Sequence, residues 1–281
     1  MMSKQLFLGD LVDEFSTSWG YDLIGSQPWL AARSQLIQLS RQTPGGFMPL
    51  EYIYANQPTG PTWVHRAIDA YYLHGPLARS VRIRLQQAVS WLRQEIEARA
   101  AHQETISILS LASGGARDII QAVADAPWRE RVDYLGIDID PDAVQYAREQ
   151  ARTAGLNGQF RFEVGNALRP PRAWEAHFDI VYSLGLLDYL RDRTAVRFIN
   201  RVYDMLRPDG AFLFGMVTSN PNQRFFEDYL NWRMIYRSPD HILSLAKSSK
   251  FAQIHPVSSA DDYFFLLECR KSNTPSSHPE E

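Results

Sequence analysis

The stretch Ile106–Asp118, which reads ISILSLASGGARD, decides the fold of this chain. Its apolar start is typical of a buried strand, and the small residues that follow predict a tight loop that opens into a helix. A second stretch, Val132–Pro141 (VDYLGIDIDP), is typical of another buried strand. That strand ends in a carboxylate, Asp138, and the pair Asp140 and Pro141 opens the next helix.

These two strand ends together predict a binding site for a nucleoside. Small residues let the backbone approach a ligand closely, and the start of a helix offers N–H groups that have no partner within the helix. A carboxylate at the neighbouring strand end can accept hydrogen bonds from both hydroxyls of a ribose. We therefore expect ligand contacts from Ala112, Ser113, Gly114, Asp138 and Ile139.

Size and charge limit the number of domains and the classes of ligand that we expect for this chain. With 281 residues and 45% hydrophobic residues, it is long enough for one large core domain and an appended cap. The net charge of −3 gives no basic surplus, so we expect a small-molecule substrate and no nucleic acid. No apolar run approaches the roughly 20 residues that cross a bilayer, so we expect no membrane insertion. A monomer and a homodimer both remain open.

Cysteine usage points to the compartment. Cys269 is the single cysteine, which excludes an internal disulfide framework and a zinc site built on cysteine pairs. We therefore expect a cytoplasmic protein without a metal site, and we expect Cys269 to be an inert, buried strand residue.

From residue 106 onward the pattern alternates between strands and helices, which predicts parallel strands with crossover helices. Two late strands follow each other closely, so one of them should run antiparallel near the sheet edge. The fold class is therefore α/β, with a Rossmann-like, mostly parallel sheet of seven strands. The expected strands are 106–111, 132–137, 159–164, 177–182, 211–217, 251–257 and 262–269, and the expected helices between them are 117–126, 141–154 and 193–206.

The N-terminal part gives no strand signal. Apolar spacing and start signals predict helices over 26–42, 63–73 and 77–100. We expect residues 1–104 to form a helical cap over the substrate and 105–270 to form the ligand-binding domain. Within that domain we expect a helical insertion at 220–248, with helices at 220–235 and 239–247, and we expect a disordered tail at 271–281.

The order of these motifs resembles class I S-adenosylmethionine-dependent methyltransferases, and the resemblance covers residues 106–270. In that family the first loop usually reads acidic, apolar, Gly, x, Gly, x, Gly. Here Ser110 replaces the acidic residue, and Ala112 and Ala116 replace two glycines. The resemblance implies that S-adenosylmethionine is the cofactor and that Asp118, just inside the following helix, contacts its methionine amino group in place of Ser110.

Later motifs carry the same resemblance. It places Asp138 on the ribose hydroxyls, Asn166 and Ala167 beside the adenine, and Ser183 at the end of the fourth strand, which faces cofactor and substrate. The turn LRPDGA, residues 206–211, resembles the one that leads into the fifth strand.

A narrower resemblance is to a bacterial subgroup associated with hydroxy-fatty-acid methyl ester biosynthesis. It is carried by the strings IDAYY (68–72), RSVRIR (79–84), SLASG (110–114), LDYL (187–190) and NWRMIYR (231–237).

Candidate catalytic residues are Tyr72, His74 and Tyr189, each a potential proton acceptor if the acceptor group needs one. Two other residue types suit substrate binding: Arg79 can clamp a carboxylate, and Tyr71 and Tyr236 can line a pocket. Each also has a plainer interpretation, because aromatic residues commonly pack in a core and Arg79 suits a solvated helix face.

Three functions fit these patterns. The first is methyl transfer to a small acceptor that is carboxylate-bearing or apolar-tailed, which needs alignment and exclusion of water more than a base. The second is a reaction that uses S-adenosylmethionine itself as substrate, by aminocarboxypropyl transfer or intramolecular cyclisation, and releases methylthioadenosine. The third is a non-catalytic, cofactor-binding regulatory module. A nicotinamide enzyme fits less well, because residues 112–117 lack the Gly-x-Gly-x-x-Gly phase and Asp118 would repel a pyrophosphate.

Overall fold

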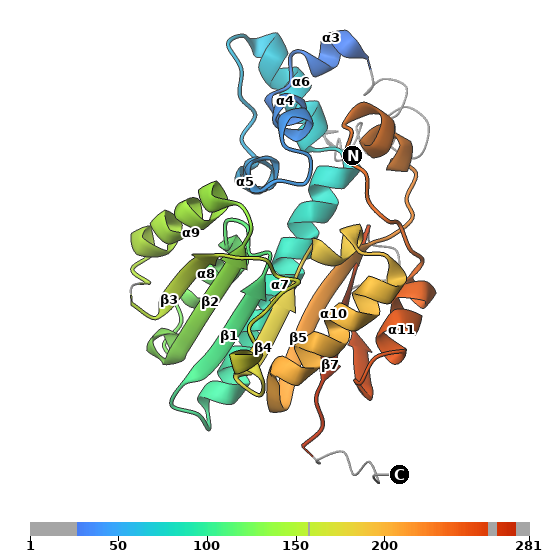
Figure 1. Ribbon diagram of the computed structural model, residues 1–281. Helices are drawn as coiled ribbons and strands as arrows, with labels where there is room; N and C mark the ends of the chain where they lie inside the picture. Colours follow the sequence, from blue (N-terminus) through green and yellow to red (C-terminus); the bar gives the residue numbers. More distant parts are fainter. Residues whose placement is uncertain (1–26, 157, 258–262, 274–281) are drawn as a thin grey trace, which may run out of the picture. The chain divides into compact units, whose positions relative to one another are not determined.

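A computed structural model describes residues 27–156, 158–257 and 263–273 of the chain (Figure 1). The chain divides into two compact units. Unit 1 holds the N-terminal part to Leu85 together with Ser219–Met234, and unit 2 holds Gln86–Thr218 together with the part from Ile235 onward. The expectations for residues 1–26, 157, 262 and 274–281, most of the expected tail included, lie outside the described part.

Unit 1 is helical, as the sequence predicts. The expected helix over 26–42 is in fact two, because Ala32 ends the first and the Ser34 side chain accepts from the Ile37 N–H to begin the second. A further helix was not expected from the sequence; its Pro49 lies in the first turn, where a missing N–H costs little. The helices are α3 (Pro28–Ala31), α4 (Gln35–Gln42), α5 (Phe47–Ala55), α6 (Trp63–Leu73) and the start of α7 (Pro76–Ala100).

A buried carboxylate, Asp69, organises unit 1. Its Oδ1 accepts from the Ser34 hydroxyl at 2.8 Å and from the Leu36 N–H at 3.0 Å, both at the start of α4. Its Oδ2 accepts from the Thr59 N–H at 3.0 Å and from the Tyr52 hydroxyl. Burial, followed by the hydrogen bond to Asp69, raises the pKa of Tyr52 to about 12, so this phenol stays protonated and donates. One side chain thus links α4, α5, α6 and the loop before α6.

The segment 219–234 of unit 1 differs from expectation. The sequence predicts a helical run over 220–235, but the structure has only a short π-type helix, η4 (Phe225–Tyr229). The Leu230 N–H bonds to the Phe225 carbonyl, and the following Asn231 adopts a left-handed φ of 53°, which ends the helix. Phe226 and Trp232 are buried on either side of this break and pack edge to face, so aromatic packing rather than helical periodicity sets the path.

Unit 2 contains a seven-stranded sheet in the order β3-β2-β1-β4-β5-β7-β6, which confirms the predicted α/β, Rossmann-like fold. Strand β7 pairs antiparallel with β5 and with β6, and the remaining pairs are parallel. The predicted antiparallel strand near the edge is therefore confirmed. The strands are β1 (Ile106–Leu111), β2 (Val132–Asp138), β3 (Phe160–Val164), β4 (Phe178–Ser183), β5 (Leu206–Val217), β6 (Gln253–Pro256) and β7 (Phe264–Arg270).

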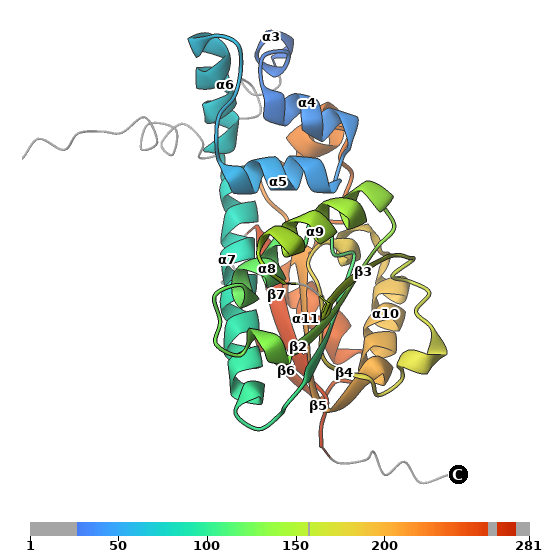
Figure 2. The same ribbon diagram turned by 90° about the vertical axis from the view of Figure 1, so that its left-hand side faces the viewer.

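Helices cover both faces of this sheet (Figures 1 and 2). Helices α10 and α11 lie on one face, and α8, α9 and the part of α7 within unit 2 lie on the other. The elements between the strands are α8 (Arg117–Val123), η1 (Arg129–Arg131), α9 (Pro141–Thr153), η2 (Arg172–Trp174), η3 (Leu186–Tyr189), α10 (Asp192–Met205) and α11 (Pro239–Lys247). Short, right-handed crossovers of this kind bring the carboxyl ends of parallel strands to one edge.

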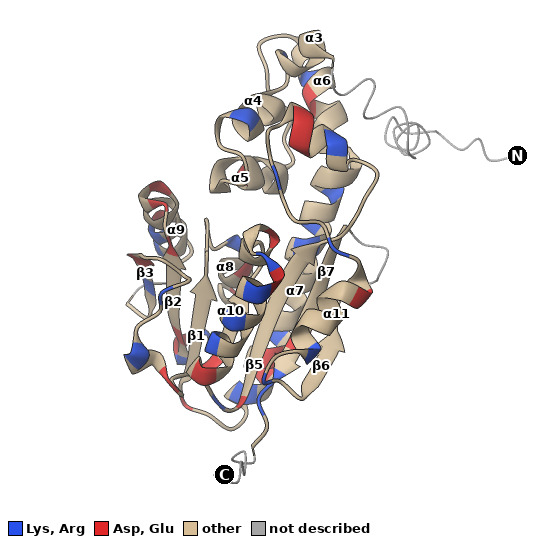
Figure 3. Ribbon diagram, turned by 45° about the vertical axis from the view of Figure 1, so that its right-hand side comes forward, with Lys and Arg blue, Asp and Glu red and all other residues tan. Residues whose placement is uncertain are grey.

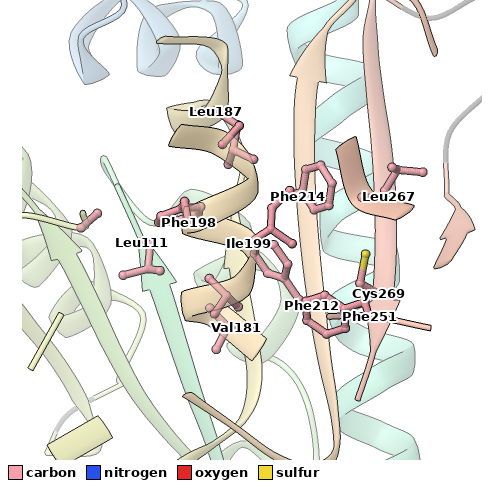
Figure 4. Close-up of a cluster of buried hydrophobic side chains, with 14 of the residues drawn as sticks. Leu111, Val181, Leu187, Phe198, Ile199, Phe212, Phe214, Phe251, Leu267 and Cys269 are labelled. Carbon is pink, nitrogen blue, oxygen red and sulfur yellow. The ribbon is translucent and has the colours of Figure 1, made fainter. Parts of the chain in front are cut away.

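The core of unit 2 lies between the sheet and α10 with α11 (Figure 4). Phe198 and Ile199 of α10 face Phe212 and Phe214 of β5 there, and Cys269 of β7 is fully buried in the same cluster. Burial raises the pKa of the Cys269 thiol to about 12, so it stays uncharged, in line with an inert core residue.

The second part of α7 is fastened to β7 by buried charges. Glu95 pairs with Arg99 one turn on at 2.8 Å and with Arg270 at 2.5 Å, while the Trp91 indole N–H donates to Glu268 at 2.9 Å. The residues from Gln86 onward therefore belong to unit 2, whereas the sequence placed the division after this helix, at residue 104.

The Asp69 network carries a testable consequence. Asp69→Asn keeps the shape but turns one acceptor into a donor that faces the Thr59 N–H and the Tyr52 hydroxyl, which should cost about 2 kcal/mol. Hydrogen exchange in α4, α5 and α6 of the full chain should then rise by about thirtyfold. Asp125→Asn, at an exposed position, should leave exchange unchanged; equal exchange in the two variants would contradict the role of Asp69.

Candidate cofactor site at the carboxyl ends of strands β1 to β4

The site lies where the strand order reverses. Strand β1 pairs with β2 on one side and with β4 on the other, and ligands of open α/β sheets bind outside the carboxyl ends at such a point. Two hydrogen bonds close this edge: the Ser183 hydroxyl donates to the Leu111 carbonyl at 2.8 Å, and the Ser113 N–H donates to the Ile137 carbonyl at 3.0 Å. The ends of β1, β2 and β4 are thus held together.

The loop after β1 has three residues in the left-handed region. Ala112 has a φ of 59°, Gly114 of 51° and Ala116 of 54°. Glycine adopts this conformation without strain, whereas an L-residue with a Cβ pays about 1 kcal/mol or more. The loop therefore keeps the backbone path of a glycine-rich turn even where alanine replaces glycine, and it stores strain at Ala112 and Ala116.

Asp138 ends β2 and ties the two loops together. Its Oδ2 accepts from the Gly114 N–H at 2.8 Å, and its Oδ1 accepts from the Asp140 N–H at 3.0 Å. The Asp140 side chain in turn accepts from the Asp142 N–H at 2.9 Å and begins α9, as the sequence predicts. A carboxylate oxygen has two acceptor positions, so each oxygen of Asp138 can accept a ligand hydroxyl as well as its backbone N–H.

Exposed apolar side chains follow three strands at the same edge. Ile139 is 73% exposed directly after β2, Leu168 is 43% exposed in the loop after β3, and Tyr189 is 46% exposed after β4. Large apolar groups left in water after β2, β3 and β4 are what a flat aromatic base can cover. The predicted contact between Ile139 and the cofactor stays a prediction.

Asn166 and Ala167 also follow β3 at this edge. The Asn166 side-chain oxygen accepts from the Leu168 N–H at 2.9 Å, so the residue forms an Asx turn, and Ala167 is buried. The turn fixes the position of the Asn166 amide, while its adenine contact stays a prediction.

A buried chain of hydroxyls lies beside the loop, and the sequence analysis did not find it. Ser110 of β1 has Gly136 of β2 and Tyr182 of β4 as its register neighbours. The Tyr182 hydroxyl donates to Asp118 Oδ1 at 3.0 Å and lies 3.4 Å from the Tyr134 hydroxyl. Only the sheet register reveals this cluster; the sequence signal was a polar Ser110 in an otherwise apolar strand.

The candidate catalytic residues of α6 lie in unit 1. Tyr72 is buried in an aromatic cluster with Tyr71 and Phe225, and burial raises the pKa of Tyr72 well above its usual range. A phenol held in this way stays protonated and packs among aromatic rings, and a role of Tyr72 in catalysis stays a prediction. His74 is exposed at the end of α6, where its Nδ1 donates to the Ala70 carbonyl at 2.9 Å, which leaves Nε2 as the accepting nitrogen of the neutral ring.

The arginines of α7 differ from one another. Arg79 is exposed, as a solvated face or a substrate clamp would require. The neighbouring Arg82 is instead committed to structure, because its guanidinium donates to the Leu73 carbonyl at 2.9 Å and to the Ile53 carbonyl at 3.4 Å.

Of the remaining candidates, Tyr189 is exposed at the site edge in unit 2, and Tyr236 is half-buried. The next residue, Arg237, is buried and pairs with Asp192 at 2.9 Å, and it also donates to carbonyls of the loop after β4. Asp188 accepts from the Val217 N–H at 2.6 Å. Asp188 and Arg237, which belong to strings that carry the narrower resemblance, therefore connect the loop after β4 with the end of β5 and with the start of α10.

Charge around unit 2 is mixed. Along α10 basic and acidic residues are interspersed (Figure 3), unlike the one-sign face that binds polyanions. In the described part of the chain, no helix is long and apolar enough to cross a membrane.

Comparison with known proteins shows a similarity to methyltransferases. Residues 108–210 match the family model described as a methyltransferase domain. A stretch of 121 residues is 29% identical to the uncharacterized protein YnbC of Escherichia coli (strain K12), covering 43% of this chain. That match spans 20% of the length of YnbC. Within unit 2, residues 108–210 are therefore similar to a methyltransferase domain.

Solved structures agree on the fold. A possible exported protein from Bordetella parapertussis superimposes with a TM-score of 0.71 at 18% identity, over 86% of this chain and 85% of that one. The S-adenosylmethionine-dependent methyltransferase SibL, in its apo form, gives a TM-score of 0.52 at 14% identity, over 93% and 73%. The CurJ carbon methyltransferase gives 0.50 at 11% identity, over 61% and 50%. At such identities the likeness concerns the fold alone.

The strain in the loop is measurable. Ala112 is exposed, so Ala112→Gly removes strain without removing buried surface and should stabilise the protein by about 1 kcal/mol, or raise the unfolding midpoint by about 2–4 °C. The matched change Ala98→Gly, at an exposed helical position in α7, should instead destabilise by about 0.5–1 kcal/mol. Thermal unfolding checks both, and a loss of stability in Ala112→Gly would contradict the strained loop.

Proposed function

We propose that this chain is an S-adenosylmethionine-dependent methyltransferase that acts on a small-molecule acceptor. The observation that carries the proposal is Asp138, whose carboxylate joins the loop after β1 to the start of α9 and lies beside the exposed Ile139. A ribose with two hydroxyls suits the carboxylate, and an adenine suits the apolar surface. The methyltransferase domain match over residues 108–210 supports the same cofactor.

A buried hydroxyl in the loop also favours an adenosyl ligand. Ser113 Oγ is buried and has no hydrogen-bond partner within the described residues. A Cβ at Gly136 would lie 3.1 Å from that oxygen and 3.0 Å from the Tyr134 hydroxyl, so glycine at this position leaves both hydroxyls their room. A buried hydroxyl without a partner at the edge of a loop suits a polar ligand atom.

When bound, S-adenosylmethionine supplies a methyl group that is already activated. The chain has to bind the cofactor through Asp138 and the loop, orient the acceptor and exclude water. For an acceptor that is already nucleophilic, such as a carboxylate, no proton acceptor is required. For an acceptor that must lose a proton, His74 Nε2 and Tyr189 are the proposed bases.

We infer that the acceptor bears a carboxylate or an apolar tail. Unit 1 supports this through its large exposed apolar side chains, Trp29, Met48, Trp63 and Ile83, which offer surface for an aliphatic group. Arg79 is the proposed clamp for a carboxylate, and Tyr71 and Tyr236 are further proposed substrate residues. Hydroxy fatty acids combine both features, so they are the first acceptors to assay. The proposed compartment is the cytoplasm, on the basis of the cysteine usage of the chain.

Cofactor binding tests the proposal. Asp138→Ala removes the ribose acceptor and should weaken S-adenosylhomocysteine binding by about a hundredfold or more, because two hydrogen bonds to a charged group are lost. Isothermal titration calorimetry measures this, with Asp125→Ala as an exposed carboxylate control that should bind as the wild type does. Undiminished binding by Asp138→Ala would contradict the site.

The reaction product identifies the chemistry. Incubation with S-adenosylmethionine and a hydroxy fatty acid should yield S-adenosylhomocysteine and a methyl ester, both measured by mass spectrometry. Methylthioadenosine as the nucleoside product would instead show that another group of the cofactor is transferred.

A further inference from the structure

We propose that Tyr182 is a positioning residue, whose hydroxyl holds the Asp118 carboxylate as the acceptor for the ammonium group of the cofactor's methionine part. The inference rests on the proposed function and extends it to a residue that makes no cofactor contact of its own. It assigns a purpose to the buried hydroxyls beside the loop.

The methionine part of S-adenosylmethionine carries an ammonium group, which a carboxylate recognises far better than a neutral hydroxyl. The end of β1 offers only Ser110, which is buried beside Gly136 and Tyr182. Between residues 111 and 123, from the end of β1 to the end of α8, Asp118 is the one carboxylate. It belongs to the first turn of α8, directly after the loop.

Two donors fix the Asp118 carboxylate. The Tyr182 hydroxyl donates to Oδ1 at 3.0 Å, and the Ile119 N–H donates to the same oxygen at 2.7 Å. Since Tyr182 comes from the end of β4 and Ile119 from α8, the carboxylate is held by two elements that are separate in sequence. This restrains its rotation, which a half-exposed aspartate on a helix would otherwise keep.

The direction of these hydrogen bonds is fixed as well. A carboxylate only accepts, so Tyr182 must donate its proton to Asp118, and the Tyr182 oxygen is left to accept from a neighbour. The Tyr134 hydroxyl lies 3.4 Å away for this purpose. Burial, followed by the charge of Asp118, raises the pKa of both phenols well above its usual range, so they stay protonated and keep this orientation.

A second observation points to a ligand at the same place. A Cβ at Gly136 would touch both the buried Ser113 Oγ and the Tyr134 hydroxyl, and Ser113 Oγ has no partner among the described residues. A buried polar atom without a hydrogen-bond partner is costly. If the hydroxyls of this cluster served packing alone, we would expect one of them to bond to Ser113 Oγ. The cluster is therefore suited to a polar ligand group beside Asp118.

The test compares two ligands that differ in the amino acid part. S-Adenosylhomocysteine carries the ammonium group, and methylthioadenosine has the same adenosine without it. Calorimetry on the full chain with Tyr182→Phe should show S-adenosylhomocysteine binding weakened by about tenfold or more, as expected for a displaced charged partner. Methylthioadenosine binding should change by less than about threefold, and that second result also shows that the variant is folded.

Asp118→Asn should give the same selective loss, and adding Tyr182→Phe to it should cause no further loss, because both changes act on one interaction. Tyr203→Phe is the matched control: it removes a phenol oxygen from α10, away from the loop, and should bind both ligands as the wild type does.

Equal loss for both ligands in Tyr182→Phe, or additive losses in the double variant, would overturn the positioning role and leave the proposed function standing. A wild-type chain that binds neither ligand would overturn the proposed function, and this inference with it.

Discussion

The carboxylate of Asp138 is the link on which the rest of the site depends. It receives one backbone N–H from the loop after β1 and one from the start of α9, so it fixes the ends of the first two strands at once. Hydrogen bonds to a charged acceptor are stronger than neutral ones, and this pair sets the spacing that a nucleoside would meet. Two further hydrogen bonds at this edge, from Ser113 to Ile137 and from Ser183 to Leu111, connect the ends of β1, β2 and β4.

The loop departs from the glycine-rich pattern of methyltransferases, and the structure shows how the fold accommodates this. Alanine occupies two left-handed positions, so the backbone path is kept at the cost of strain. At Ser110 the change of residue type is matched by a different arrangement, in which Tyr182, Tyr134 and Asp118 fill the space beside β1. The left-handed backbone is thus formed by alanines in place of glycines, and the carboxylate beside the loop belongs to Asp118 rather than to position 110.

Much of unit 2 could be predicted, because its signals are local. Asp140 with Pro141, and Ser238 with Pro239, begin helices by capping chemistry that is visible in the sequence. The path of residues 220–235 could not be predicted, since the aromatic side chains there pack within unit 1 and Asn231 turns left-handed. The residues of the candidate cofactor site could be predicted to lie at one edge, because parallel strands place their carboxyl ends there.

The hydrogen-bond networks were beyond sequence reasoning, because their partners are far apart in the chain. Asp69 meets Ser34, and Arg237 meets Asp192 across 45 residues. Arg237 belongs to a string that carries the narrower resemblance, yet its guanidinium donates to carbonyls and a carboxylate within unit 2. A charged residue in a motif of suspected function therefore needs its partners before it is given a chemical role.

The central claim is that an adenosine lies across the ends of β1 and β2, held by Asp138. A crystal structure of the chain with S-adenosylhomocysteine tests this most directly. The account predicts both ribose hydroxyls within hydrogen-bond distance of the Asp138 carboxylate and the adenine against Ile139. Electron density for the ligand at another place, or a ribose that does not reach Asp138, would contradict it.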